Sequence, residues 1–155
     1  MAKILAIDPG PVMSAFVLWD SEKHDFFGMR MGLMDNEEWL DLGFIANLLQ
    51  EVDLCIIEMI QSYGMGVGRT TFITCTIVGR IQLLCEDNNT PWKMYGRPTI
   101  AGQIGGKGDT KIRASLRMRY GDAKKGEKLE GVKKDIWAAL ALAVAWEENP
   151  TLKEW

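Results

Sequence analysis

The chain has 155 residues, of which 47% are hydrophobic and 25% are charged, and its formal net charge is −3. This length and composition fit one compact domain covering residues 1–155 and leave little room for a second. The sequence has no uncharged apolar run near the roughly 18 residues of a membrane helix and no basic start followed by an apolar signal segment, so we expect a soluble, cytoplasmic protein.

The first third of the chain predicts three strands followed by a helix. Residues 2–8 ("AKILAID") and 13–20 ("MSAFVLWD") are short apolar runs joined by the turn sequence "PGPV", and residues 24–32 ("HDFFGMRMG") predict a third strand. Three consecutive strands indicate an antiparallel meander. Residues 36–52 place apolar side chains at helical spacing behind an acidic first turn, which predicts one continuous helix.

The rest of the chain alternates strands with helices. The expected elements are a buried strand at 53–59, a glycine-rich link at 62–68, a helix at 70–86, a short strand at 91–96, a basic helix at 109–121 and an apolar helix at 133–148. Consecutive strands followed by this alternation indicate an α/β fold with a mixed five-stranded sheet flanked by α-helices.

The cysteines and the histidine argue against a zinc site. Cys55, Cys75 and Cys85 lie in apolar runs and form no C-x-x-C pair, which predicts reduced thiols in the core. His24 is the only histidine, so zinc ligands of the usual kinds are lacking.

Charge is strongly segregated along the chain. Residues 1–92 contain 5 Lys and Arg against 13 Asp and Glu, whereas residues 93–134 contain 12 against 4. One interpretation is a solvated, lysine-rich face. The other is a basic surface beside an acidic pocket, which an enzyme acting on a phosphate backbone needs.

Two buried strands end on an acid, and a third acid opens the last helix. Asp8 and Glu58 come at the ends of their strands, where open α/β sheets bind ligands, and Asp135 lies just past the basic segment. Clustered carboxylates need a cationic partner, and Mg²⁺ prefers oxygen ligands of this kind. In the competing interpretation Asp8 caps a turn, Glu58 pairs with an arginine, and Asp135 only favours a helix N-terminus.

At these positions the sequence resembles a known family. "ILAIDPG" followed by a second strand, "IIEM" followed by a glycine-rich link, and "DIWAALALAVA" near the C-terminus resemble the RuvC-type Holliday junction resolvases of the ribonuclease H-like superfamily, particularly their bacteriophage relatives. The resemblance covers nearly the whole chain in the right order. It implies a ribonuclease H-like fold, a homodimer, and cleavage of four-way junctions and other branched DNA with Mg²⁺ or Mn²⁺, in the cytoplasm of a bacterial host if a phage encodes the protein.

The resemblance also implies residue roles. Asp8, Glu58 and Asp135 correspond to metal ligands, for two ions per active site, and Lys111 corresponds to a catalytic cation beside the scissile phosphate. Family members commonly carry a second acidic or metal-binding residue three positions into the last helix, where this chain has Ala138. The site therefore has one metal-binding residue fewer than the family pattern.

Further residues suit contact with DNA. Tyr63 in the glycine-rich link could stack on an unpaired base, and Arg69 follows the link at a helix start, where a phosphate would lie. Positive charges gather in and before the basic helix, and the expected phosphate contacts are Lys107, Lys111, Arg113, Arg117 and Arg119.

The helix at 70–86 carries an apolar stripe that suits either the core or a dimer interface. The stripe consists of Phe72, Cys75, Val78, Gly79 and Leu83. In the resembled family the corresponding helix helps to form the dimer, so part of the stripe is expected to pack against a second copy.

Other functions remain open at the level of sequence. A protein that binds branched DNA without cutting it is compatible with Ala138 in place of a metal-binding residue. A ribonuclease H-like nuclease for other nucleic-acid structures shares the same chemistry. A sugar kinase or actin-like ATPase needs a second domain, and Arg69 stands where a Walker lysine would be required.

Overall fold

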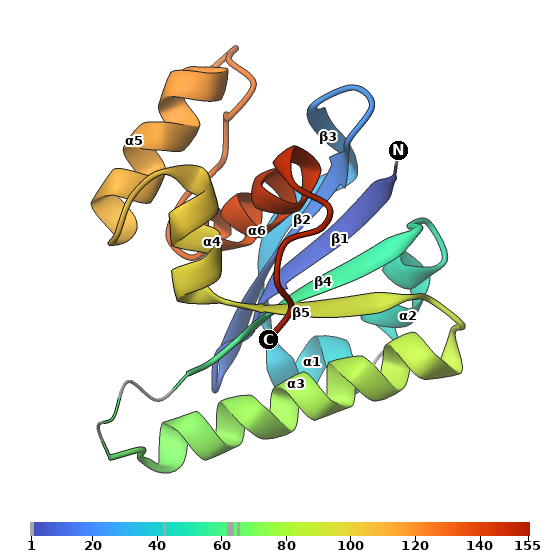
Figure 1. Ribbon diagram of the computed structural model, residues 1–155. Helices are drawn as coiled ribbons and strands as arrows, with labels where there is room; N and C mark the ends of the chain where they lie inside the picture. The colour runs from blue at the N-terminus through green and yellow to red at the C-terminus, as the bar shows by residue number, and fades with distance from the viewer. Residues whose placement is uncertain (1, 42, 62–63, 65) are drawn as a thin grey trace.

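The computed structural model describes residues 2–41, 43–61, 64 and 66–155, in which five strands form one sheet of order β3-β2-β1-β4-β5 (Figure 1). The strands are β1 (Lys3–Asp8), β2 (Met13–Asp20), β3 (Asp25–Asp35), β4 (Leu54–Met59) and β5 (Trp92–Gly96). β1, β2 and β3 pair antiparallel, while β4 and β5 continue the sheet parallel to β1. The predicted meander and mixed five-stranded sheet are confirmed.

Helices cover both faces of the sheet. They are α1 (Asn36–Asp41), α2 (Phe44–Leu49), α3 (Arg69–Asp87), α4 (Arg97–Ile104), α5 (Asp109–Tyr120) and α6 (Ile136–Glu148). Figure 1 shows α1, α2 and α3 below the sheet and α4, α5 and α6 above it. The long α3 runs across the bottom of this view.

The strand pattern explains the two layers of helices. Successive side chains of a strand point to opposite faces. In β1, Ile4 and Ala6 pack with α4, α5 and α6, while Leu5 and Ile7 pack with α2 and α3. A strand covered on both faces needs apolar residues at every position, and that is why "ILAI" reads as a continuous apolar run.

Helix α6 is buried against the upper face of the sheet. Its residues from Ala139 to Ala145 are at most 1% exposed, and small alanines alternate with larger apolar residues among them. A helix buried all round carries no polar face, as the sequence indicated. It begins at Ile136, so that Asp135 becomes its N-cap residue.

A largely buried glutamate, Glu147, connects α6 to its neighbours. Oε1 of Glu147 accepts a hydrogen bond from Nε1 of Trp19 at 3.1 Å and lies 2.8 Å from Nδ1 of His24. Oε2 accepts from the hydroxyl of Tyr120 at 3.3 Å. Because Tyr120 closes α5, this contact fastens the basic helix to α6.

One helix prediction is wrong, and one helix was not predicted. The helix expected at 36–52 is two short helices, and Gly43, with φ 70°, caps the start of α2. A left-handed φ favours glycine and interrupts a right-handed helix. Helix α4 was not foreseen, because "RPTIAGQI" has no clear apolar face; Pro98 in its first turn and Gly105, with φ 109°, bound it.

The thiols are free, as predicted. Cys55 and Cys85 are buried in the core and Cys75 is half-buried on α3. A hydrogen bond between the two buried thiols, together with burial, raises the pKa of Cys55 well above its ordinary value. Neutral thiols therefore act as apolar core residues here.

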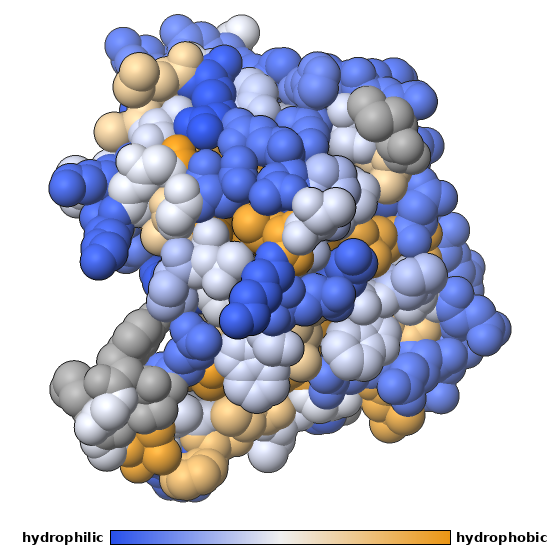
Figure 2. All heavy atoms as spheres, viewed as in Figure 1, coloured by the Kyte–Doolittle hydropathy of each residue, from blue (hydrophilic) through white to orange (hydrophobic). Residues whose placement is uncertain are grey.

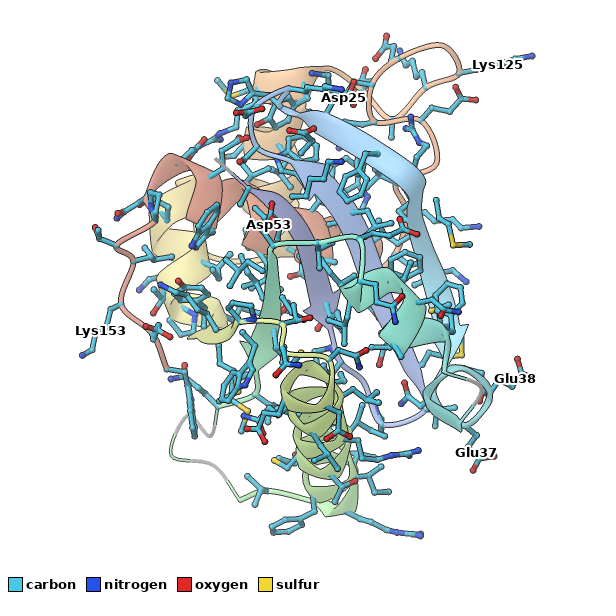
Figure 3. The ribbon with its side chains drawn as sticks, turned by 90° about the vertical axis from the view of Figure 1, so that its right-hand side faces the viewer. Asp25, Glu37, Glu38, Asp53, Lys125 and Lys153 are labelled. Atoms are coloured by element: carbon cyan, nitrogen blue, oxygen red, sulfur yellow. The ribbon has the colours of Figure 1, made fainter. Side chains whose placement is uncertain are left out.

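Many charged side chains lie on the periphery. Glu37 and Glu38, in the first turn of α1, point away from the fold, and Lys125 projects from the loop between α5 and α6 (Figure 3).

Among the described residues, no helix combines the length and apolarity needed to cross a membrane.

Candidate active site

Asp8 and Glu58 lie side by side at one edge of the sheet. Strands β1 and β4 are parallel neighbours in which Ile7 is paired with Ile57, so the next residue of each strand comes to the same carboxyl edge. Their side chains are 14% and 11% exposed. Two carboxyl groups placed together and largely buried disfavour each other's negative charge unless a cation or a proton balances it.

The environment of Asp8 disfavours its negative charge. Burial, followed by the charge of Glu58, raises the pKa of Asp8 to about 8, and Asp135 adds to the rise while Arg97 opposes it. Such a shift marks a functional-site candidate, because a buried acid with a like-charged partner is normally neutralised by a bound cation or a proton.

Asp135 belongs to the same electrostatic group. It precedes α6 as its N-cap residue but makes no capping hydrogen bond, so its side chain is not committed to the helix start. Ala138 follows one turn later, and both residues line a small cavity of about 30 Å³ together with Glu58. The position of Ala138, where the family pattern has a metal-binding residue, therefore faces the same space as Asp135.

Arg97 is the site residue that sequence reasoning missed. Its Nε donates to Oε1 of Glu58 at 2.6 Å and its Nη1 to Oδ1 of Asp109 at 2.8 Å, while its Nη2 lies 4.0 Å from Oδ2 of Asp8. The expectation that Glu58 could pair with an arginine is confirmed. A signal was present, since Arg97 follows directly on β5, whose parallel partner β4 carries Glu58.

The donor set suits a divalent cation, although Arg97 stands within it. Carboxylate oxygens at two strand ends are the ligands that Mg²⁺ and Mn²⁺ prefer. Among the residues that the structure describes, no group of three or more His, Cys, Asp or Glu side chains is arranged to hold a metal ion as it stands. The positive charge that lies beside the carboxyl pair is the guanidinium of Arg97.

The expected DNA contacts differ in how free they are. Arg113 lines the 30 Å³ cavity beside Arg97, and its Nε is buried without a hydrogen-bond partner. Lys107 is exposed just before α5, Lys111 is exposed in its first turn, and Arg69 is exposed as the first residue of α3. All four remain candidates for phosphate contact.

Two other arginines of α5 have partners within the chain. Arg119 donates from Nε to Oε1 of Glu148 at 2.5 Å and from Nη2 to the carbonyl of Ile104 at 3.2 Å. Arg117 lies 3.6 Å from Asp122 and stacks on the ring of Trp137. Arg119 therefore connects α5 to α6, a role that a count of positive charges does not reveal.

Tyr63 lies outside the described residues.

A pocket opens beside the acid pair. It has a volume of about 290 Å³ and is lined by Asp8, Pro9, Glu58, Met59, Ile60, Gln61 and Arg97. The left side of the molecule in Figure 2 is hollowed between the region of α4 and α5 above and the start of α3 below. The carboxyl ends of β1 and β4 point to this side in Figure 1.

The place of Ala138 leads to a first prediction. Ala138→Asp adds a carboxylate to the space that Asp135 already lines, so the Mg²⁺ concentration needed for thermal stabilisation is expected to fall severalfold. The matched variant Ala139→Asp buries an unpaired acid at a position that is 0% exposed, and it is expected to lose roughly 3 kcal/mol of unfolding free energy without a gain in metal affinity. Thermal unfolding titrated with Mg²⁺ separates the two, and equal behaviour of both variants contradicts the assigned register.

Comparison with solved structures identifies the fold. Thermus thermophilus RuvC in complex with a Holliday junction substrate superimposes with a TM-score of 0.74 at 13% identity, covering 98% of both chains. A second Thermus thermophilus RuvC structure gives 0.71 at 14% identity over 100% of both chains. The yeast mitochondrial Holliday junction resolvase gives 0.53 at 13% identity, over 94% of this chain and 78% of the other.

Neither a scan against protein-family models nor a search of curated proteins finds a match. At these low identities the structural likeness establishes the fold, and the expected ribonuclease H-like, RuvC-like fold is confirmed.

Proposed function

We propose that this chain is a metal-dependent, structure-selective endodeoxyribonuclease that cleaves Holliday junctions and other branched DNA by phosphodiester hydrolysis. The observation that carries the proposal is the pair of largely buried acids, Asp8 and Glu58, at the carboxyl ends of two adjacent parallel strands. The likeness of the whole fold to a RuvC that was solved with a Holliday junction substrate supports the choice of branched DNA.

The residues divide into metal ligands and phosphate contacts. Asp8 and Glu58 are the central ligands for Mg²⁺ or Mn²⁺, and Asp135 completes the set for two ions. When bound, such ions activate a water molecule and stabilise the charge that develops on the phosphate and the leaving oxygen. Water adds to phosphorus, the bond to the 3′ oxygen breaks, and a 5′ phosphate results.

Basic side chains orient the DNA and balance its charge. Arg113 lines the same cavity as the acids, so its guanidinium adds positive charge beside them. Lys111 supplies a mobile positive charge from the first turn of α5, where it stabilises negative charge on the transition state. Lys107 and Arg69 extend the phosphate-binding surface on either side.

A homodimer is part of the proposal. The apolar stripe of α3 is divided, since Val78 is 2% exposed and belongs to the core, whereas Phe72 and Leu83 are 62% and 57% exposed. Large apolar side chains exposed on one helix suit packing against a second copy. Two active sites related by a two-fold axis then match the symmetry of a four-way junction.

The sequence motifs extend the proposal to biological context. Because "ILAIDPG", "IIEM" and "DIWAALALAVA" most resemble bacteriophage members of the family, we place the protein in that branch. Its site of action is then the cytoplasm of a bacterial host.

A second candidate function is binding of branched DNA without cleavage. Two observations favour it: Arg97 neutralises the acid pair, and Ala138 occupies a position that usually holds a metal-binding side chain. A DNA-binding protein of this kind needs the basic surface but not the metal.

Cleavage of synthetic DNA decides between the two. The substrates are a four-way junction, a Y-shaped duplex and a linear duplex of matched sequence, each incubated with Mg²⁺ or Mn²⁺ and with a chelator. We expect paired nicks in the four-way junction that depend on metal, and little or no cutting of the linear duplex. Tight junction binding with no nicking under any metal condition overturns the nuclease and supports the binding protein.

A further inference from the structure

Arg97 contacts the acid cluster with all three of its guanidinium nitrogens. Each nitrogen is directed at a different carboxylate: Nε to Glu58 at 2.6 Å, Nη1 to Asp109 at 2.8 Å, and Nη2 toward Asp8 at 4.0 Å. Glu58 and Asp8 are largely buried, whereas the side chain of Asp109 is 64% exposed. The guanidinium thus bridges from the inner acid pair to an outer acid at the start of α5.

We propose that Arg97 is the resident counter-ion of the acid pair, that it competes with the divalent metal, and that it retains Asp109 but releases Glu58 and Asp8 when the metal binds. This inference rests on the proposed function, since it takes Asp8 and Glu58 as metal ligands. It explains why, among the described residues, the acids at this edge of the sheet are not arranged to hold a metal ion while Arg97 contacts them.

Competition follows from the chemistry of the carboxylates. An oxygen that accepts a short, charge-assisted hydrogen bond from an arginine has less charge to offer a metal ion, and a guanidinium beside a divalent cation is repelled by it. If the Arg97–Glu58 contact must break before the metal binds, the free energy of metal binding is less favourable by the free energy of that contact.

Asp109 gives the displaced guanidinium a partner. It is the first residue of α5, it is 64% exposed, and it already accepts a hydrogen bond from Nη1 of Arg97. Arginine has a long, flexible stem, so its head can pivot about the Asp109 contact without movement of the backbone. Arg97 and Asp109 both line the 30 Å³ cavity, so the guanidinium has space on the side of Asp109.

The test compares metal affinity in two arginine variants. Mn²⁺ binding to the metal-free protein is followed by calorimetry and by electron paramagnetic resonance, at about pH 8.5 so that proton uptake by the freed acids does not mask the gain. Arg97→Gln is expected to bind Mn²⁺ about tenfold more tightly than the wild type, because a competing charge-assisted contact is removed. Arg30→Gln is the matched control: it removes an arginine that stacks on Phe26 of β3, and the affinity is expected to stay unchanged.

A second variant and a second readout guard against misfolding. Arg97→Lys keeps the charge but replaces the planar fork by a single ammonium group, and its affinity for Mn²⁺ is expected to fall between the other two. Without metal, Arg97→Gln is expected to melt below the wild type, since two buried acids lose their counter-ion, and excess Mn²⁺ is expected to restore its melting temperature.

Arg97→Gln protein that binds Mn²⁺ no more tightly than the wild type overturns the inference. The proposed function fails separately: a wild-type protein that cuts no DNA, combined with tighter Mn²⁺ binding by Arg97→Gln, rejects the nuclease and retains the competition.

Discussion

Asp8→Asn and Glu58→Gln are each expected to lower the rate of junction cleavage by about 10³-fold or more while the protein remains folded. The amides keep the shape and part of the hydrogen bonding of the acids but not the charge that holds a divalent ion. Asp53→Asn is the matched control, because Asp53 accepts a hydrogen bond from the backbone of Lys3, away from the site, and its amide can do the same. Single-turnover cleavage of a four-way junction measures the effect, and a near wild-type rate in either site variant refutes the metal assignment.

The Asp8 variant also carries a pH signature in the absence of metal. Because the pKa of Asp8 is raised from 3.8 to about 8 in the folded protein, the folded state holds a proton that the unfolded state has released between these values. Stability conferred by the neutral wild-type site therefore falls as pH rises from about 4 to about 8. Asp8→Asn removes this loss, so its melting temperature relative to the wild type is expected to increase over the same range. Thermal unfolding in chelator at several pH values tests this, and a constant difference across the range contradicts it.

Asp8→Asn protein, which cannot cut, is expected to bind a four-way junction at least about tenfold more tightly than a linear duplex of the same length. A two-fold dimer can place two basic surfaces on two arms at once, whereas one duplex cannot satisfy both. Competition binding in chelator measures the ratio. Equal affinity for the two DNAs rules out junction selectivity even if the metal site is correct.

The salt dependence of that binding tests which arginines of α5 contact phosphate. Arg117 is 47% exposed and lies 3.6 Å from Asp122, so DNA can replace this partner. Each phosphate contact contributes about 0.9 to the slope of log affinity against log salt, so Arg113→Gln with Arg117→Gln should flatten the slope by up to about 2. Arg119→Gln is the comparison, since Arg119 is tied to Glu148 and to the carbonyl of Ile104. We expect it to leave the slope close to the wild type and to lower the melting temperature instead. An unchanged slope in the double variant moves the DNA-binding face away from α5.

Several features of the fold follow from local pattern. The run "ILAI" indicates a strand covered on both faces, and the apolar sequence of α6 indicates a buried helix, because burial on all sides leaves no room for polar residues. Patterns of this kind do not reveal a single residue whose backbone adopts a left-handed φ. Gly43 shows this, since the apolar spacing continues through it while its left-handed φ divides the predicted helix in two.

The sequence by itself determined the acid pair, and the tertiary structure decided what the pair contacts. Asp8 and Glu58 could be predicted because each ends a buried strand, and parallel strand ends meet at one edge of a sheet. The place of Arg97 directly after β5 brings it near Glu58, but the direction of its long side chain, and so its contact with Glu58, is decided by the packing. Likewise, charge along the chain marks α5 as basic, but only the packing of α5 on α6 places Glu148 against Arg119 and gives that arginine a partner within the chain. Strand ends are positioned by local alternation and backbone pairing, whereas ion pairs between distant elements depend on how those elements pack.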